Sequence, residues 1–104
     1  LGPAITCGAK VVDALRTHSL FITTRLNGEV VQHCSMKEMI FSTEEIIATL
    51  SSYMVLLPGD VIATGTPAGV GVARDRYLVS GDELSFEVSE PDVFQLDALH
   101  VKVA

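Results

Sequence analysis

This chain of 104 residues has few of the residues that define several common classes of protein. It has two cysteines, Cys7 and Cys34, which are too few for a disulfide framework and favour a reduced protein of the cytoplasm. It has 7 Lys and Arg against 13 Asp and Glu, and its basic residues are scattered, so no stripe neutralises nucleic-acid phosphates. No apolar run approaches a membrane span, and no signal peptide is recognisable. Nucleic acid and membrane are therefore not expected as partners.

Several catalytic motifs are also missing. The glycine-rich stretch 65–71 is not followed by Gly-Lys-Ser/Thr, so it is not a P-loop, and it lacks the third glycine of a dinucleotide fingerprint. No G-x-S-x-G elbow occurs. His33 and Cys34 are neighbours, and neighbours on a strand point to opposite faces, so they cannot form a nucleophile–base pair.

The composition indicates a folded piece of a larger protein. Hydrophobic residues make up 48% of the chain, which is enough for a core and argues against disorder. The length allows one small domain but not two. Because the chain starts at Leu1 rather than at a methionine, we expect residues 1–104 to be a single partial domain of a longer polypeptide.

The clearest structural signal is a β-hairpin between Ser19 and Cys34. Asn27-Gly28 supplies the two positive-φ residues of a type I′ turn. A two-residue loop pairs residue 26 with residue 29, and this register places Thr23 opposite Gln32. The direction of Gln32 is then defined, and it is either a ligand contact or a polar group on the solvent side of the sheet.

The sequence also predicts one helix, over residues 42–54. Ser42 caps it, Glu45 completes a capping box, and Glu44 adds negative charge at the positive end of the dipole, which accounts for both acids without catalysis. An apolar stripe is expected to pack on the sheet. Residues 1–18 are predicted to be mostly loop, and residues 83–89 and 95–103 to be strands.

Residues 57–71 combine a turn, an apolar run and a glycine-rich loop. Pro58-Gly59-Asp60 predicts the turn, and Val61-Ile62-Ala63 predicts a buried strand. Thr64-Gly65-Thr66-Pro67 then presents two hydroxyl groups and a bare backbone at a rigid strand end, where small polar ligands are commonly held. An ordinary strand-to-loop transition is the alternative explanation.

The motif GDVIATGTPAGVG at residues 59–71 resembles the signature near the C-terminus of the fumarylacetoacetate hydrolase family. Other segments resemble family motifs in the same order along the chain. They are Leu1-Gly2-Pro3, Asn27-Gly28-Glu29-Val30-Val31-Gln32, Glu38-Met39-Ile40-Phe41-Ser42 and Ser80-Gly81-Asp82. The resemblance implies an α+β fold, a mixed β-roll or β-sandwich with one packed helix, of which residues 1–104 would be the C-terminal half of a catalytic domain.

This resemblance also implies a function. The intact enzyme would cleave, decarboxylate or isomerise 2-oxo or 1,3-diketo acids with Mg²⁺, or Mn²⁺ or Ca²⁺ in its place, held by an E-x-E pair and an aspartate upstream of this chain. Thr66 matches the family threonine that contacts substrate oxygen atoms. Gly65 would let the backbone approach the substrate, and Gln32 is a further substrate-binding candidate. No catalytic residue is assigned in this chain.

The chain itself offers a poor set of metal ligands. Only Glu90-Pro91-Asp92 places two carboxylates one residue apart, and it lies in a proline turn, outside the family order. We therefore expect no metal or other cofactor on residues 1–104 alone. The alternative function is a truncated, non-catalytic structural fragment. Under either function we expect a homodimer, or association with the upstream half.

Overall fold

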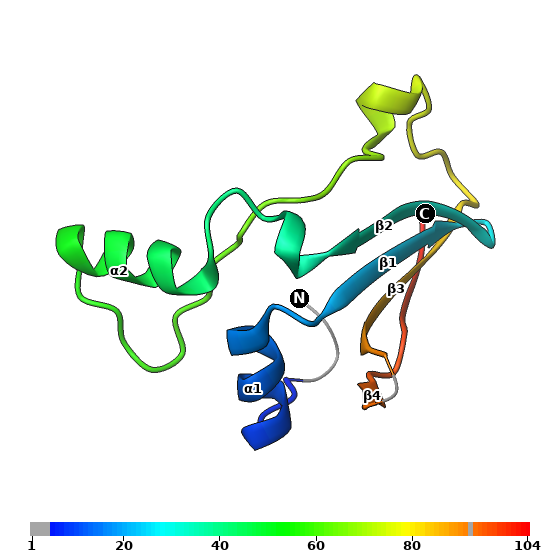
Figure 1. Ribbon diagram of the computed structural model, residues 1–104. Coiled ribbons are helices and arrows are strands. Elements are labelled where there is room, and N and C mark those ends of the chain that lie inside the picture. The colour runs from blue at the N-terminus through cyan, green and yellow to red at the C-terminus, as the bar shows by residue number, and fades with distance from the viewer. Residues whose placement is uncertain (1–4, 92) are drawn as a thin grey trace.

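The computed structural model describes residues 5–91 and 93–104. The resembling segment Leu1-Gly2-Pro3 and Asp92 lie outside the described residues. An antiparallel sheet fills one side of the molecule, and a helix lies apart from it on the other (Figure 1). The strands follow the order β2-β1-β3, and β4 and β5 both pair with the remaining edge of β3. The expected α+β fold is confirmed.

The predicted hairpin is formed by β1 (Phe21–Leu26) and β2 (Glu29–Ser35). Asn27 and Gly28 have φ angles of 51° and 84°, which are the two positive values that a type I′ turn requires. Leu26 pairs with Glu29 as predicted.

The register beyond the turn differs from the prediction by one residue. Arg25 pairs with Val30, but Thr24 pairs with Gln32, so Val31 is an extra residue in β2. Such a β-bulge sends the following side chains to the opposite face of the sheet. The predicted pairing of Thr23 with Gln32 is therefore wrong, because a bulge inside a strand leaves no signal in the turn that sets the register.

The third long strand, β3 (Glu83–Glu90), confirms the strand expected at residues 83–89. It pairs with β1 along the whole length of β1, from Phe21↔Ser89 to Leu26↔Leu84. The predicted terminal strand is instead two short ones, β4 (Phe94–Gln95) and β5 (Leu99–Lys102). Their registers on β3 differ by one residue, so one continuous ladder cannot include both.

Residues 1–18 were expected to be mostly loop, but α1 (Ala9–Thr17) is a helix. It ends at His18, whose φ of 54° is left-handed, and the N–H of Ser19 donates to Ala14 O (3.1 Å). Ala14 is its one buried residue. A helix that buries a single small residue leaves only a weak apolar stripe in the sequence, so the periodicity does not predict it.

The second helix, α2 (Thr43–Tyr53), confirms the predicted capping box. Ser42 Oγ accepts from Glu45 N (3.2 Å), and Glu45 Oε2 accepts from Ser42 N (2.7 Å). These hydrogen bonds lower the pKa of Glu45. The helix does not pack on the sheet as expected: it holds no buried residue and lies beyond the end of β2 (Figure 1).

Residues 54–79 run back from α2 to the sheet. The predicted turn is present, with Asp60 N donating to Leu57 O (3.1 Å) and Gly59 at a φ of 101°. The strand predicted at residues 61–63 is wrong. These residues belong to no strand, and Val61 is 67% exposed, because no neighbouring strand in the described part of the chain pairs with them. A short 3₁₀ helix, η2 (Gly71–Arg74), follows.

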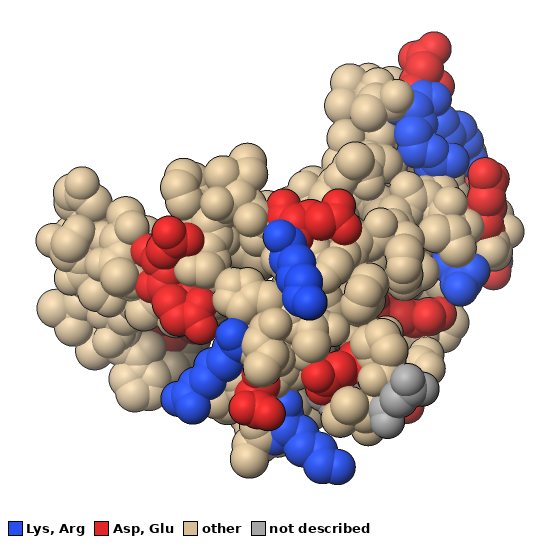
Figure 2. Space-filling view, in the orientation of Figure 1, with Lys and Arg blue, Asp and Glu red and all other residues tan. Residues whose placement is uncertain are grey.

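Charged side chains are distributed over the surface. On the face shown in Figure 2, Lys and Arg side chains lie singly or in small groups beside Asp and Glu. Among the described residues, no helix combines the length and the hydrophobicity that crossing a membrane requires.

Candidate functional site

A cavity of about 530 Å³ lies between the sheet and the segment that carries the T-G-T-P motif. Its first wall is the end of β2, the 3₁₀ helix η1 (Met36–Glu38) and the approach to α2. Its second wall is residues 64–68, so the predicted residues Gly65 and Thr66 both line it. Both are exposed rather than sealed in the core. The T-G-T-P loop therefore does present polar groups to a cavity, as the sequence predicts.

Gln32 holds this loop from the sheet. Its Nε2 donates to Thr66 Oγ1 (3.0 Å) and to the carbonyl oxygen of Pro67 (2.9 Å). A backbone carbonyl can only accept, so the second bond fixes which end of the Gln32 amide faces the loop. Thr66 Oγ1 therefore accepts a hydrogen bond from Gln32, and its own O–H remains free to donate.

Gly69 lets the loop come this close to the sheet. Its φ is 106°, and an added Cβ would lie 2.0 Å from Val31 O and 2.9 Å from Gln32 Cγ. Val31 is the bulge residue of β2. The bulge thus positions two groups against the loop. The carbonyl of Val31 lies beside Gly69, and the side chain of the next residue, Gln32, points to the loop.

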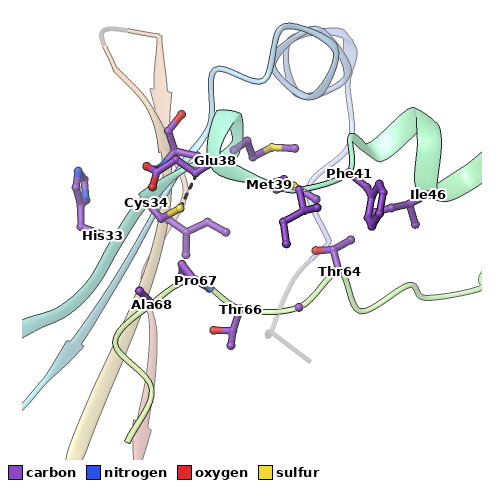
Figure 3. A pocket seen from close by; sticks show the side chains of 15 residues that line it. His33, Cys34, Glu38, Met39, Phe41, Ile46, Thr64, Thr66, Pro67 and Ala68 are labelled. Atoms are coloured by element: carbon purple, nitrogen blue, oxygen red, sulfur yellow. Dashed lines mark hydrogen bonds between the residues drawn. The ribbon is translucent and has the colours of Figure 1, made fainter. Parts of the chain in front are cut away.

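The two threonines of the motif lie on opposite sides of the extended chain (Figure 3). Thr64 points towards Met39 and Phe41, which come from the segment before α2. Thr66 points the other way, which is the alternation of an extended backbone.

One wall of the cavity includes none of the predicted site residues. Its residues lie in η1 and in the segment before α2, and the available signal was their resemblance to a family motif. They include Met36, Glu38, Met39, Ile40 and Phe41.

Cys34 also lines the cavity, but its surroundings do not activate it. Burial first, and then the nearby carboxylate of Glu38, raise the pKa of its thiol. A raised pKa leaves little thiolate at neutral pH, so Cys34 is a poor nucleophile. His33 projects from the opposite face of β2 (Figure 3), where its Nδ1 lies 3.0 Å from Thr23 Oγ1. This agrees with the prediction that the two residues do not form a pair.

The cavity is poor in charge. Glu38 is the one acidic side chain among the described lining residues, and that set includes no Lys or Arg. Glu38 Oε1 accepts from Ser35 N (3.1 Å), which caps η1. No three His, Cys, Asp or Glu side chains converge among the residues that the structure describes. These residues do not fit a divalent cation, which requires several oxygen ligands.

A second anchor ties the far end of the loop to the sheet. Asp82, which is 5% exposed, accepts from Arg76 Nη2 (2.8 and 2.9 Å), from Asn27 Nδ2 (2.8 Å) and from Val79 N (2.9 Å). These hydrogen bonds, that of Arg76 foremost, lower the pKa of Asp82 from 3.8 to about 2. The segment that forms the cavity wall is thus fixed at Gln32 and again at Asp82.

Comparisons with known proteins agree on one family. The sequence matches the model of the family described as fumarylacetoacetate (FAA) hydrolase C-terminal over residues 1–103. Oxaloacetate tautomerase FAHD2B, a mitochondrial protein of Homo sapiens, is 47% identical over 92 residues, covering 86% of this chain and 28% of that protein. Oxaloacetate tautomerase YisK of Bacillus subtilis is 41% identical over 90 residues, covering 85% of this chain and 29% of that protein.

A solved structure shows the same fold. Maleylpyruvate hydrolase from Sphingobium sp. SYK-6, in complex with manganese (II) ion and pyruvate, superposes with a TM-score of 0.70 at 30% identity. The match covers 84% of this chain and 29% of that one. The chain therefore spans less than a third of the length of these relatives.

Proposed function

Because the chain belongs to the fumarylacetoacetate hydrolase family, which its match over residues 1–103 shows, we propose that it supplies one wall of an enzyme active site for a small 2-oxo acid. The observation that carries the proposal is the exposed Thr66 at the cavity, with its oxygen held by Gln32. The reaction is hydrolysis, decarboxylation or tautomerisation of the acid. Oxaloacetate is the first substrate to test, since two relatives are oxaloacetate tautomerases.

In this proposal the Thr66 hydroxyl donates to a carboxylate or carbonyl oxygen of the substrate. Gln32 Nε2 occupies one of the two lone pairs of Oγ1, so the hydroxyl hydrogen points away from Gln32 and is free to donate to the ligand. A hydrogen bond to a charged group contributes about 1.5–3 kcal/mol, or about 10- to 100-fold in rate if it acts in the transition state. The role of Thr66 is to orient the substrate.

Residues 1–104 would then be the C-terminal part of a longer catalytic domain. The share of each relative that they match supports this, and so does the exposed apolar surface around α2. We propose that polypeptide of the same enzyme, either its upstream part or a second copy, covers this surface. The predicted location in the cytoplasm stays a prediction. The relative FAHD2B is a mitochondrial protein.

The charge of the cavity lining supports the proposal that another part of the enzyme supplies a cationic group to this site. A 2-oxo acid is an anion, but the described lining offers it no Lys or Arg and one carboxylate, that of Glu38. We propose that a divalent cation, Mg²⁺ or Mn²⁺ or Ca²⁺, is held by residues outside this chain. Calorimetric titration of residues 1–104 with Mg²⁺ and Mn²⁺ is expected to show no specific binding. Stoichiometric micromolar binding would contradict this proposal.

The test of Thr66 is the variant Thr66→Val in the protein as its gene encodes it. We expect kcat/KM for oxaloacetate to fall by about 10- to 100-fold, because valine has the shape of threonine and no hydroxyl. Thr66→Ser should keep most of the activity. Thr49→Val, on the exposed part of α2, is the matched control and should behave as the parent protein.

Two outcomes would reject the role of Thr66. One is near-normal turnover of oxaloacetate, acylpyruvates and dienedioates by Thr66→Val. The other is an equal loss in Thr49→Val. If every version of the protein is inactive, the alternative of a non-catalytic structural fragment is favoured.

A further inference from the structure

We propose that Gln32 is a positioning residue, which acts through Thr66 and makes its hydroxyl a hydrogen-bond donor to the ligand. This inference rests on the proposed function and differs from the direct substrate contact that the sequence predicts for Gln32. It follows from three features of the structure: the polarity of the Gln32 amide, the bulge that aims it and the glycine that admits the loop.

The polarity of the amide is the first feature. Gln32 Nε2 donates both of its hydrogens, one to Thr66 Oγ1 and one to Pro67 O. Neither hydrogen is left for a ligand. A threonine hydroxyl has one hydrogen and can rotate, so an isolated Thr66 could offer a ligand either that hydrogen or a lone pair. The Gln32 bond occupies a lone pair and turns the hydrogen outwards.

The aim of the side chain is the second feature. Without the extra residue Val31, the two-residue turn would place Gln32 opposite Thr23, on the other face of the sheet. The bulge moves it to the face of Thr24, on which the T-G-T-P segment lies. Bulges commonly redirect a side chain next to a functional site.

The close approach of the loop is the third feature. Gly69 lies against the carbonyl of Val31, in a space that no Cβ could share. The amide of Gln32 therefore meets a loop that is already held beside it. The close approach of Gly69 and the two hydrogen bonds of Gln32 hold the loop against β2, and the residue that carries the hydroxyl, Thr66, stays exposed.

The proposal also predicts a ligand preference. A hydroxyl whose hydrogen is turned away from Gln32 offers that hydrogen first, which favours ligands with an acceptor oxygen at this point, such as a carboxylate or a ketone. A ligand that carries an amide N–H₂ or an ammonium group there has only the remaining lone pair of Thr66 Oγ1 to bind, and is expected to bind more weakly.

A double-mutant cycle decides between positioning and direct contact. In the protein as its gene encodes it, Gln32→Met should lower kcat/KM for oxaloacetate by about 10-fold. In the Thr66→Val background the same change should have no further effect, because the hydroxyl that Gln32 orients is gone. Multiplication of the two losses would mean that Gln32 acts independently of Thr66, and would overturn the proposal.

A charge variant provides a second test that does not depend on Gln32→Met folding well. In Gln32→Glu the ionised carboxylate can only accept, so Thr66 must donate to it and loses its hydrogen for the substrate. We expect a loss of about 10- to 100-fold at about pH 8, partly recovered relative to the parent protein as the pH falls to about 5 and the carboxyl gains a proton. A loss that does not change with pH would contradict the proposal.

The matched control is Gln95, the other glutamine of the chain, which is exposed on β4. Gln95→Met and Gln95→Glu should keep the activity and the pH profile of the parent protein. The proposed function fails if Thr66→Val is active. The positioning role fails separately, if Thr66→Val is inactive but Gln32→Met is fully active.

Discussion

The two parts of this molecule are ordered in different ways. The sheet part, residues 9–35 and 80–103, is held by antiparallel strand pairing and contains every buried residue in the described part of the chain. These residues are Ala14, Leu20, Thr24, Leu26 and Asp82. The loop part, residues 39–79, contains none and exposes large apolar side chains such as Ile40 and Tyr53.

The difference shows where the candidate site gets its geometry. The loop part has no core of its own, yet it carries Gly65 and Thr66. Its position comes from contacts with the sheet part, at Gln32, at Val31 and at Asp82. A site built this way depends on a few hydrogen bonds and one close approach rather than on packing, and each of them can be changed singly.

The largest expected effect is on the sheet part. Leu26→Ala, at a residue that is 7% exposed, should lower the free energy of unfolding of residues 1–104 by about 2–5 kcal/mol, since it removes a buried side chain and leaves a cavity. The matched change Leu57→Ala in the loop part, at a residue that is 63% exposed, should cost under about 0.5 kcal/mol. Urea denaturation measures both. Equal losses would mean that the two parts do not differ as described.

A smaller effect is expected where the two parts meet. Gly69→Ala combines a left-handed backbone with an overlap on Val31 O, and should cost about 1–3 kcal/mol and move Thr66 away from Gln32. Gly59→Ala is the control, because its φ of 101° is similar and its Cβ would meet open space. Oxaloacetate turnover should fall in the first variant and persist in the second. If the two variants behave alike, the overlap with the bulge is unimportant.

The smallest effect is confined to acid pH. The pKa of Asp82 in the folded state is about 2, below its ordinary value of 3.8. Its contribution to stability is therefore complete above about pH 4 and is lost as the pH falls towards 2. Asp82→Asn should remove this part of the pH dependence of the free energy of unfolding. Parallel acid profiles of the parent and the variant would show that the carboxylate is not held as the structure indicates.

Local signals in the sequence predicted those elements whose conformation depends on residues close together in the chain. Asn27-Gly28 encodes the hairpin turn through its two positive φ angles, and Ser42 with Glu45 encodes the start of α2. The T-G-T-P motif predicted polar groups where a small ligand can be held, and residues 64–68 do line a cavity, although the strand expected before them is absent. The roles of Gly65 and Gln32 as substrate contacts stay predictions.

Other features depend on contacts between distant residues. Helix α1 forms around a single buried alanine, and residues 61–63 have the composition of a strand but no strand beside them to complete it. The wall at Met39 and Phe41 likewise follows only from the placement of the loop against β2.

By itself the sequence determined the family, the hairpin turn, the capped helix and the polar loop that lines the cavity, since each depends on residues close together in the chain. Only the tertiary structure decided the face on which Gln32 lies. That choice depends on one extra residue in β2, Val31, whose carbonyl lies beside Gly69 and whose neighbour Gln32 donates to the carbonyl of Pro67. Side chains alternate every residue, so this single displacement moves Gln32 from one face of the sheet to the other.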